Sequence, residues 1–218
     1  YVSKNSLSDF ISPIIDFLSS IGINFFGSDP VSAGFGLFNA GGIIFMIIGI
    51  GLSKMLADKY GKRNVFGVFL FISTLFILVF YVLSPDSINL IFGAQIFHGF
   101  FYGITIPLLW AMIADVADYS EWKNNRRATA IIFSAMMVGL KLGLSIGGAL
   151  VASILGSYGY VPNSVGEQTE SAILGTKMLV SIFPSIPFLV AAALLFFYII
   201  DKKMEEKIEQ DLLKKRKS

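Results

Sequence analysis

One lysine is the strongest candidate for a functional residue, because it is a charged side chain in the middle of a long apolar stretch. Lys141 lies near the midpoint of the apolar stretch 129–155, which holds no other charged residue. An unpaired ammonium group in hydrocarbon costs at least a few kcal/mol. A lysine stem reaches roughly 6 Å, whereas the membrane interface would be about 15 Å away. We therefore predict that Lys141 faces a polar pathway; a structural ion pair between helices is the alternative.

The residues around Lys141 separate into two faces when they are placed at 100° intervals. Ser145 lies one turn away on the face of Lys141. Gly139, Gly143 and, more obliquely, Gly147 fall on the opposite face, at the spacing that lets helix backbones approach closely. The pattern predicts that the glycine face packs against another helix while the lysine face lines the pathway.

A second polar stripe lies in the uncharged stretch 88–113. Gln95, His98, Tyr102 and Thr105 fall within about 80° of one another on a helix. Such a stripe indicates a helix face that lines a water-filled pathway. Asn39, in an earlier apolar stretch, is a weaker candidate for the same pathway. His98 is the only histidine, so no multi-histidine metal site exists. The alternative for His98 is a hydrogen bond to a neighbouring helix.

Charged residues gather directly after this stretch. Asp115 and Asp118 share a helix face at i, i+3, and we predict an ionic latch between helices, with a solvated loop as the alternative. The charged cluster consists of Asp115, Asp118, Glu121, Lys123, Arg126 and Arg127.

The sequence lacks the residue sets that catalysis would need. It has no Ser/His/Asp set, no phosphate-binding loop and no cysteine, so we predict no enzyme activity, cofactor or metal site.

The elements that must position these residues are expected to cross a membrane. The 218 residues are 55% hydrophobic and 15% charged, against about 45–50% and about 25% in soluble domains. A net charge of +2 gives no reason to expect nucleic-acid binding. Stretches of about 20 apolar residues span a bilayer as helices, which predicts an all-α membrane protein with five transmembrane helices. The five stretches are 31–53, 65–83, 88–113, 129–155 and 173–200.

The placement of basic residues predicts the orientation. Four of the 17 follow the first stretch, three lie between the third and fourth, and seven follow the fifth, so fourteen fall on one side. Cytoplasmic loops carry such an excess of lysine and arginine. We therefore expect a multi-pass protein of the cell membrane with its N-terminus outside and its C-terminus in the cytoplasm.

The two ends of the chain carry shorter patterns. Residues 6–22 are interrupted by Pro13 and two aspartates, which indicates an amphipathic segment on the outer face. The tail, 201–218, is expected to continue the last helix along the inner membrane surface; a solvated charged tail is the alternative. Its apolar positions, spaced at i, i+4 and i+8, are Met204, Ile208 and Leu212.

Several motifs resemble one transporter family. The block A-D-V-A-D-Y-S-E-W-K at 114–123, the K-L-G that begins at Lys141 and the G-Y-V-P-N at 159–163 resemble the glycoside–pentoside–hexuronide:cation symporters. These form the melibiose-permease-like branch of the major facilitator superfamily. The loop A-D-K-Y-G-K-R at 57–63 resembles the cytoplasmic loop motif of that superfamily in part, because Lys54 replaces its upstream glycine.

The resemblance implies a fold and residue roles. The five stretches would be helices eight to twelve of a twelve-helix fold, with residues 1–5 a remnant of helix seven. Lys141 matches a helix-eleven lysine associated with the cation and sugar site. Asp115, Asp118 and Arg127 match a charged cluster that closes the inner gate. The carboxylates that bind the cation belong to the amino-terminal half, which this sequence lacks.

These inferences predict secondary active transport of a glycoside, pentoside or hexuronide, coupled to Na⁺ or H⁺. The expected partners are the sugar, the coupling cation, membrane lipid and the missing amino-terminal half. The organisation would be an outer-face segment (1–30), a transmembrane bundle (31–200) and a basic cytoplasmic tail (201–218). Lysophospholipid:cation symport and a non-transporting membrane sensor or scaffold are the alternatives.

Overall fold

The computed structural model describes residues 4–22, 29–162 and 168–217. Every regular element in these ranges is a helix. The proposed helix-seven remnant lies largely outside the described residues, as does Asn163 of the G-Y-V-P-N motif. The elements are α1 (Lys4–Ser20), α2 (Pro30–Tyr60), α3 (Lys62–Val82), α4 (Ile88–Asn124), α5 (Thr129–Ser157), α6 (Glu170–Val180), α7 (Ile182–Leu194), the short 3₁₀ helix η1 (Leu195–Phe197) and α8 (Lys202–Lys217).

Five of the described helical segments are long and apolar enough to cross a membrane. They correspond to α2, α3, α4, α5 and the combined segment from α6 to η1, and each overlaps most of one of the five predicted stretches. The prediction of an all-α membrane protein is thus confirmed. The structure extends α4 to Asn124, beyond the apolar stretch that ends at residue 113, because a helix that leaves the hydrocarbon can continue with charged residues.

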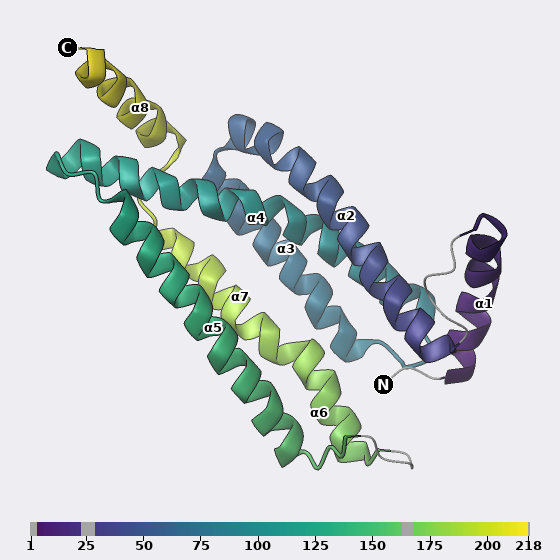
Figure 1. Ribbon diagram of the computed structural model, residues 1–218. Helices are drawn as coiled ribbons and strands as arrows, with labels where there is room; N and C mark the ends of the chain where they lie inside the picture. The colour runs from purple at the N-terminus through teal and green to yellow at the C-terminus, as the bar shows by residue number, and fades with distance from the viewer. Residues whose placement is uncertain (1–3, 23–28, 163–167, 218) are drawn as a thin grey trace.

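The tightest packing joins α2 to α4 through glycines (Figure 1). A Cβ atom on Gly99 would collide with the carbonyl oxygen of Gly42, and one on Gly103 with that of Met46. Backbone therefore lies directly against backbone, which only small residues permit. The other face of α4 packs on α3, where Val65, Ile104 and Leu108 form a buried apolar cluster.

The amphipathic N-terminal segment is a helix that folds back on the bundle. In α1, Leu7 and Ile11 are buried against Ala33 of α2 and Ile88 of α4. Figure 1 shows α1 beside the first turns of α2. The predicted amphipathic character is confirmed, and the side of the membrane on which α1 lies stays a prediction.

The last predicted span is broken into two helices at Ser181, whose φ of −127° and ψ of −75° are not helical. The cause is Pro184, whose ring clashes with the carbonyl group four residues earlier, at Val180, and which donates no hydrogen bond. Side-chain hydroxyl groups satisfy carbonyls around the break. Ser181 Oγ donates to Lys177 O at 2.5 Å, and Ser185 Oγ donates to Ser181 O at 2.6 Å.

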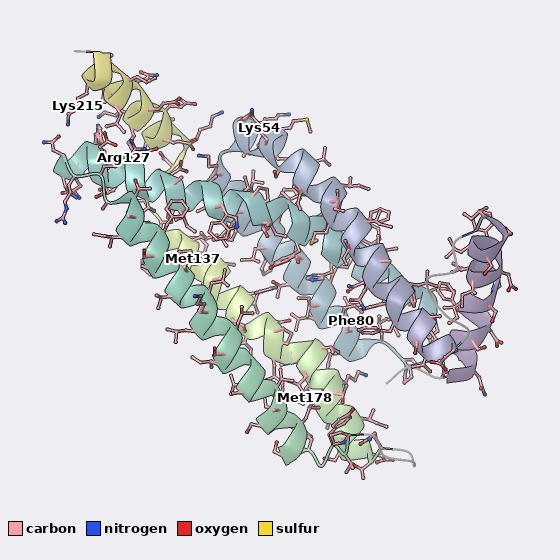
Figure 2. All side chains as sticks on the ribbon, in the orientation of Figure 1. Lys54, Phe80, Arg127, Met137, Met178 and Lys215 are labelled. Atoms are coloured by element: carbon pink, nitrogen blue, oxygen red, sulfur yellow. The ribbon has the colours of Figure 1, made fainter. Side chains whose placement is uncertain are left out.

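The prediction that the tail continues the last helix is wrong, whereas its place on the inner membrane surface stays a prediction. The chain leaves the helical conformation after η1, and α8 begins separately at Lys202. Its apolar side packs on the end of α4, where Ile208 and Leu212 contact Tyr119 and Trp122. The apolar spacing was therefore correct, but protein rather than lipid covers that face. Figure 2 places Lys54, Arg127 and Lys215 at this end of the bundle, hereafter the α8 end, and Phe80 and Met178 at the opposite end.

Candidate functional site

Lys141 lies in the middle of the least packed helix. No residue of α5 is buried, and α5 contacts chiefly α4 and α6, its neighbours along the chain. At 1.5 Å per residue, Lys141 is about 18 Å from the start of α5 and about 24 Å from its end. Its side chain is exposed, and within the described ranges no hydrogen bond or ion pair involves it. The ammonium group is thus accessible at mid-helix, at the depth expected from the sequence.

The rest of α5 is equally open. Ser145, on the face of Lys141, is exposed. On the opposite face, Gly139, Gly143 and Gly147 have no heavy atom within 4 Å of the position that a Cβ would take. The predicted packing of this glycine face is therefore not found among residues 4–22, 29–162 and 168–217. Tyr158, just beyond the helix, ties α5 to α6 by a hydrogen bond from its hydroxyl to Met178 Sδ at 3.4 Å.

The polar stripe of α4 is packed between helices instead. His98 Nδ1 lies 2.9 Å from Ser73 Oγ of α3, and the His98 ring stacks on Tyr102 with centroids 5.7 Å apart. Tyr102 in turn stacks on Phe188 of α7. These contacts correspond to the alternative named for His98, a hydrogen bond to a neighbouring helix, and a pathway role for the stripe stays a prediction.

The other pathway candidates also have protein partners. Gln95 lies against Gly42, where its amide nitrogen would be 2.7 Å from a Cβ on that glycine. Thr105 is buried and donates to Tyr102 O of its own helix. Asn39 donates to Phe35 O at 2.8 Å. Of the seven candidates, only Lys141 and Ser145 are exposed without a partner among the described residues.

Three charged residues form an ionic contact at the α8 end. Lys62 Nζ lies 2.7 Å from Asp115 Oδ1 and 2.9 Å from Glu205 Oε1. One lysine therefore joins the starts of α3 and α8 to the last turns of α4. Arg127, by contrast, faces Glu121 at 3.7 Å within the α4–α5 corner. Asp115 thus makes an inter-helix ionic contact, in which its partner is Lys62, also bound by Glu205, and a latch role for the cluster stays a prediction.

A pocket of about 360 Å³ opens beside this contact, lined by carboxylates from α4 and α8. Asp118 and Glu209 line it together with the three residues of the ionic contact. No group of three or more His, Cys, Asp or Glu side chains in the described part of the chain has a metal-binding arrangement. The pocket is thus a polar cleft between α4 and α8.

Further contacts at the α8 end escaped the sequence analysis. Trp122 Nε1 donates to Asp211 Oδ2 at 3.0 Å. Tyr198 donates its hydroxyl hydrogen to Met112 O at 3.2 Å, and burial raises the pKa of this phenol. Lys62 and Glu205 were missed because they lie far from Asp115 in sequence. One indication of this pairing was present in the sequence: Lys62 and Glu205 are expected on the same side of the predicted bundle as Asp115.

The comparisons with known proteins agree with this architecture. Residues 17–202 match the family described as MFS/sugar transport protein. An uncharacterized 29.9 kDa protein of Pseudescherichia vulneris is 35% identical over 72% of this chain and 57% of its own length. No solved structure shows a significant match.

Two relatives from Escherichia coli strain K12 have names that state a function. The putative glycoside/cation symporter YagG is 30% identical over 75% of this chain and 35% of its own length. The glucuronide carrier protein homolog is 30% identical over 78% of this chain and 38% of its own length. The chain thus spans between about a third and just over half of the length of these relatives. With five apolar helices and a family match over residues 17–202, this multi-pass membrane protein belongs to the MFS/sugar transport protein family, in its melibiose-permease-like branch.

Proposed function

We propose that this chain forms the carboxy-terminal half of a secondary active transporter that takes up a glycoside, pentoside or hexuronide together with Na⁺ or H⁺. The family match and the names of two relatives, a glycoside/cation symporter and a glucuronide carrier homolog, support a sugar substrate. The coupling ion is cargo in this scheme and not a cofactor. Five spanning helices correspond to helices eight to twelve of the fold.

The observation that carries the proposal is the exposed ammonium group of Lys141. A charge at the centre of a spanning helix is costly in lipid, so such residues generally face a bundle interior or a water-filled cavity. No carboxylate of this chain lies near the middle of a spanning helix. We therefore assign the partners of Lys141 to the substrate, to water and to carboxylates of the amino-terminal half.

The ligands that Lys141 can bind follow from the hydrogen-bond donors of its ammonium group. An ammonium group has three N–H donors and no acceptor, so it can bind sugar hydroxyls or a hexuronide carboxylate. With neither substrate nor cation bound, it can neutralise the carboxylates that hold the cation. Ser145, one turn along the same exposed face, would supply a further hydroxyl contact.

The α8 end supplies the gate in this proposal. Lys62, Asp115 and Glu205 fasten α3, α4 and α8 to one another, and Asp118 faces the adjacent cleft. Alternating access moves one bundle against the other, so the contacts that open and close would be those that this cluster makes with the amino-terminal half. Fourteen of the 17 basic residues fall on this side, which supports a cytoplasmic α8 end and an outer location for α1.

The test is uptake by the full-length transporter in cells or proteoliposomes. A panel of labelled glycosides, pentoses and glucuronides is offered with Na⁺, and with a proton gradient alone. We expect one sugar class to accumulate with one of the two ions, and Lys141→Leu to abolish that uptake while the protein level in the membrane is unchanged. Ile146→Leu is the control, since Ile146 lies on the same helix about 140° away. Accumulation of lysophospholipid without any sugar, or unchanged uptake by Lys141→Leu, contradicts the proposal.

A further inference from the structure

A groove of about 580 Å³ runs between α3 and α7 at the α8 end. Its walls are apolar: Gly67, Val68 and Phe71 contribute from α3, and Leu189 and Ala193 contribute from α7. The volume falls within the range of small-molecule sites, about 300–1,000 Å³. Lipid tails are the surrounding solvent of these helices, so an apolar groove here is open to a chain-like apolar ligand.

The mouth of the groove is basic. Arg63, in the first turn of α3, lines it beside Asn64. Within the described residues, the Arg63 guanidinium makes one hydrogen bond, from Nη1 to Tyr198 O at 3.0 Å. A guanidinium has five N–H donors in a planar fork, so most of them are available to an outside acceptor. Tyr198 thus holds the guanidinium in place without neutralising it.

The dimensions of the groove match one leaflet of a bilayer. From Arg63 to Phe71 the helix rises about 12 Å at 1.5 Å per residue. Half of the hydrocarbon core measures about 15 Å. When Arg63 lies at the level of the head groups, the apolar walls therefore extend through most of one leaflet.

We propose that this groove binds a phospholipid, with the phosphate on Arg63 and an acyl chain between α3 and α7. Phosphate is the acceptor that the planar guanidinium binds in a bidentate manner, and basic pockets between membrane helices recognise such head groups. A sugar would find no hydrogen-bonding groups along the apolar walls. The inference is independent of the proposed sugar transport, because no residue of the groove belongs to the Lys141 face.

Photo-crosslinking tests this site in the full-length transporter reconstituted in vesicles. One probe is a phosphatidylglycerol with a diazirine on an acyl chain, and the second is the matching diacylglycerol, which lacks the phosphate. We expect phosphatidylglycerol to label peptides that cover residues 63–71 and 189–196. Arg63→Gln should reduce this labelling several-fold and leave labelling by diacylglycerol unchanged, whereas Ala193→Phe should reduce labelling by both probes.

The control variants distinguish a specific lipid-binding site from nonspecific contact with bulk lipid. Lys59→Gln removes a positive charge at the same end of the bundle without lining the groove, and Ile47→Phe adds bulk to an exposed position of α2. Both should label like the parent protein, and all variants are compared at equal amounts of folded protein. Equal phosphatidylglycerol labelling of Arg63→Gln and the parent overturns the role of Arg63. Phosphatidylglycerol labelling that is no stronger at residues 63–71 and 189–196 than along the rest of the spanning helices overturns the site itself.

Discussion

Two neighbouring helices carry glycines at the same four-residue spacing and use them differently. In α4, Gly99 and Gly103 lie directly against the backbone of α2. In α5, a Cβ added at Gly139, Gly143 or Gly147 would have no heavy atom of the described part of the chain within 4 Å. The spacing therefore shows that a helix can approach a partner closely, but it does not show which partner or whether this chain supplies it.

The polar residues of the same two helices differ in the same way. In α4, His98 forms a hydrogen bond with Ser73, and the Tyr102 ring stacks between His98 and Phe188. Lys141 of α5 is exposed, and α5 has no buried residue. A helix with both an unpartnered charge and an uncovered small-residue face is expensive to leave in lipid. This supports the proposal that α5 completes its contacts in the full-length transporter.

The largest expected effect is on the covered glycines. Gly99→Leu places a side chain against the Gly42 backbone, which cannot move aside as a side chain could, so we expect a loss of about 3 kcal/mol or more, the upper end of the overpacking range. Thermal unfolding in detergent measures it. Gly93→Leu is the matched control, because this glycine of α4 has nothing within 4 Å. Equal stability of the two variants would show that α2 and α4 do not pack in this way.

The uncovered glycines should show the opposite behaviour. A Cβ added at Gly143 has no heavy atom of the described residues within 4 Å, so for Gly143→Leu we expect normal insertion and an unchanged unfolding temperature for this part of the protein. In the full-length transporter, however, the added side chain should obstruct packing and lower uptake severalfold. Normal uptake by Gly143→Leu would place the glycine face of α5 in lipid and remove the contrast with α4.

A smaller effect is expected where α8 covers α4. Ile208 is 3% exposed, and Ile208→Ala should loosen α8 by about 2–4 kcal/mol, within the range for large-to-small core changes. Hydrogen exchange of residues 202–217 measures this local opening. Leu213→Ala, at a position that is 48% exposed, is the control and should leave exchange nearly unchanged. Equal exchange in both variants would mean that the tail is solvated.

The smallest effect is expected from the ionic contact at the same end. Glu205→Gln removes one of two carboxylates on Lys62, and the Glu205 side chain is 32% exposed. Partly exposed ion pairs contribute about 0–1 kcal/mol, so α8 should loosen less than in Ile208→Ala. The same exchange measurement applies, with the exposed Glu206→Gln as the control. A loss larger than that of Ile208→Ala would show that charge, and not apolar burial, fastens α8.

The spanning helices could be predicted from the sequence because about 20 apolar residues in a row leave few physical alternatives. The spacing of Ile208 and Leu212 also predicted an amphipathic helix. The residues that cover its apolar face could not be predicted, because Tyr119 and Trp122 lie far away in the chain. The same limit hid Lys62 as the partner of Asp115 and Gly42 as the partner of Gly99. The break at Ser181 had a local signal in Pro184, but proline in a membrane helix also permits an unbroken helix, as Pro107 does in α4.

The central claim is that Lys141 faces water inside a membrane-embedded transporter. This chain contains no cysteine, so a single Lys141→Cys substitution, with any cysteines elsewhere in the transporter replaced, gives an unambiguous label site. The account predicts rapid modification by a water-soluble cationic thiol reagent, with Ile146→Cys unreactive. A cysteine at position 141 that resists the reagent as completely as one at position 146 would contradict it.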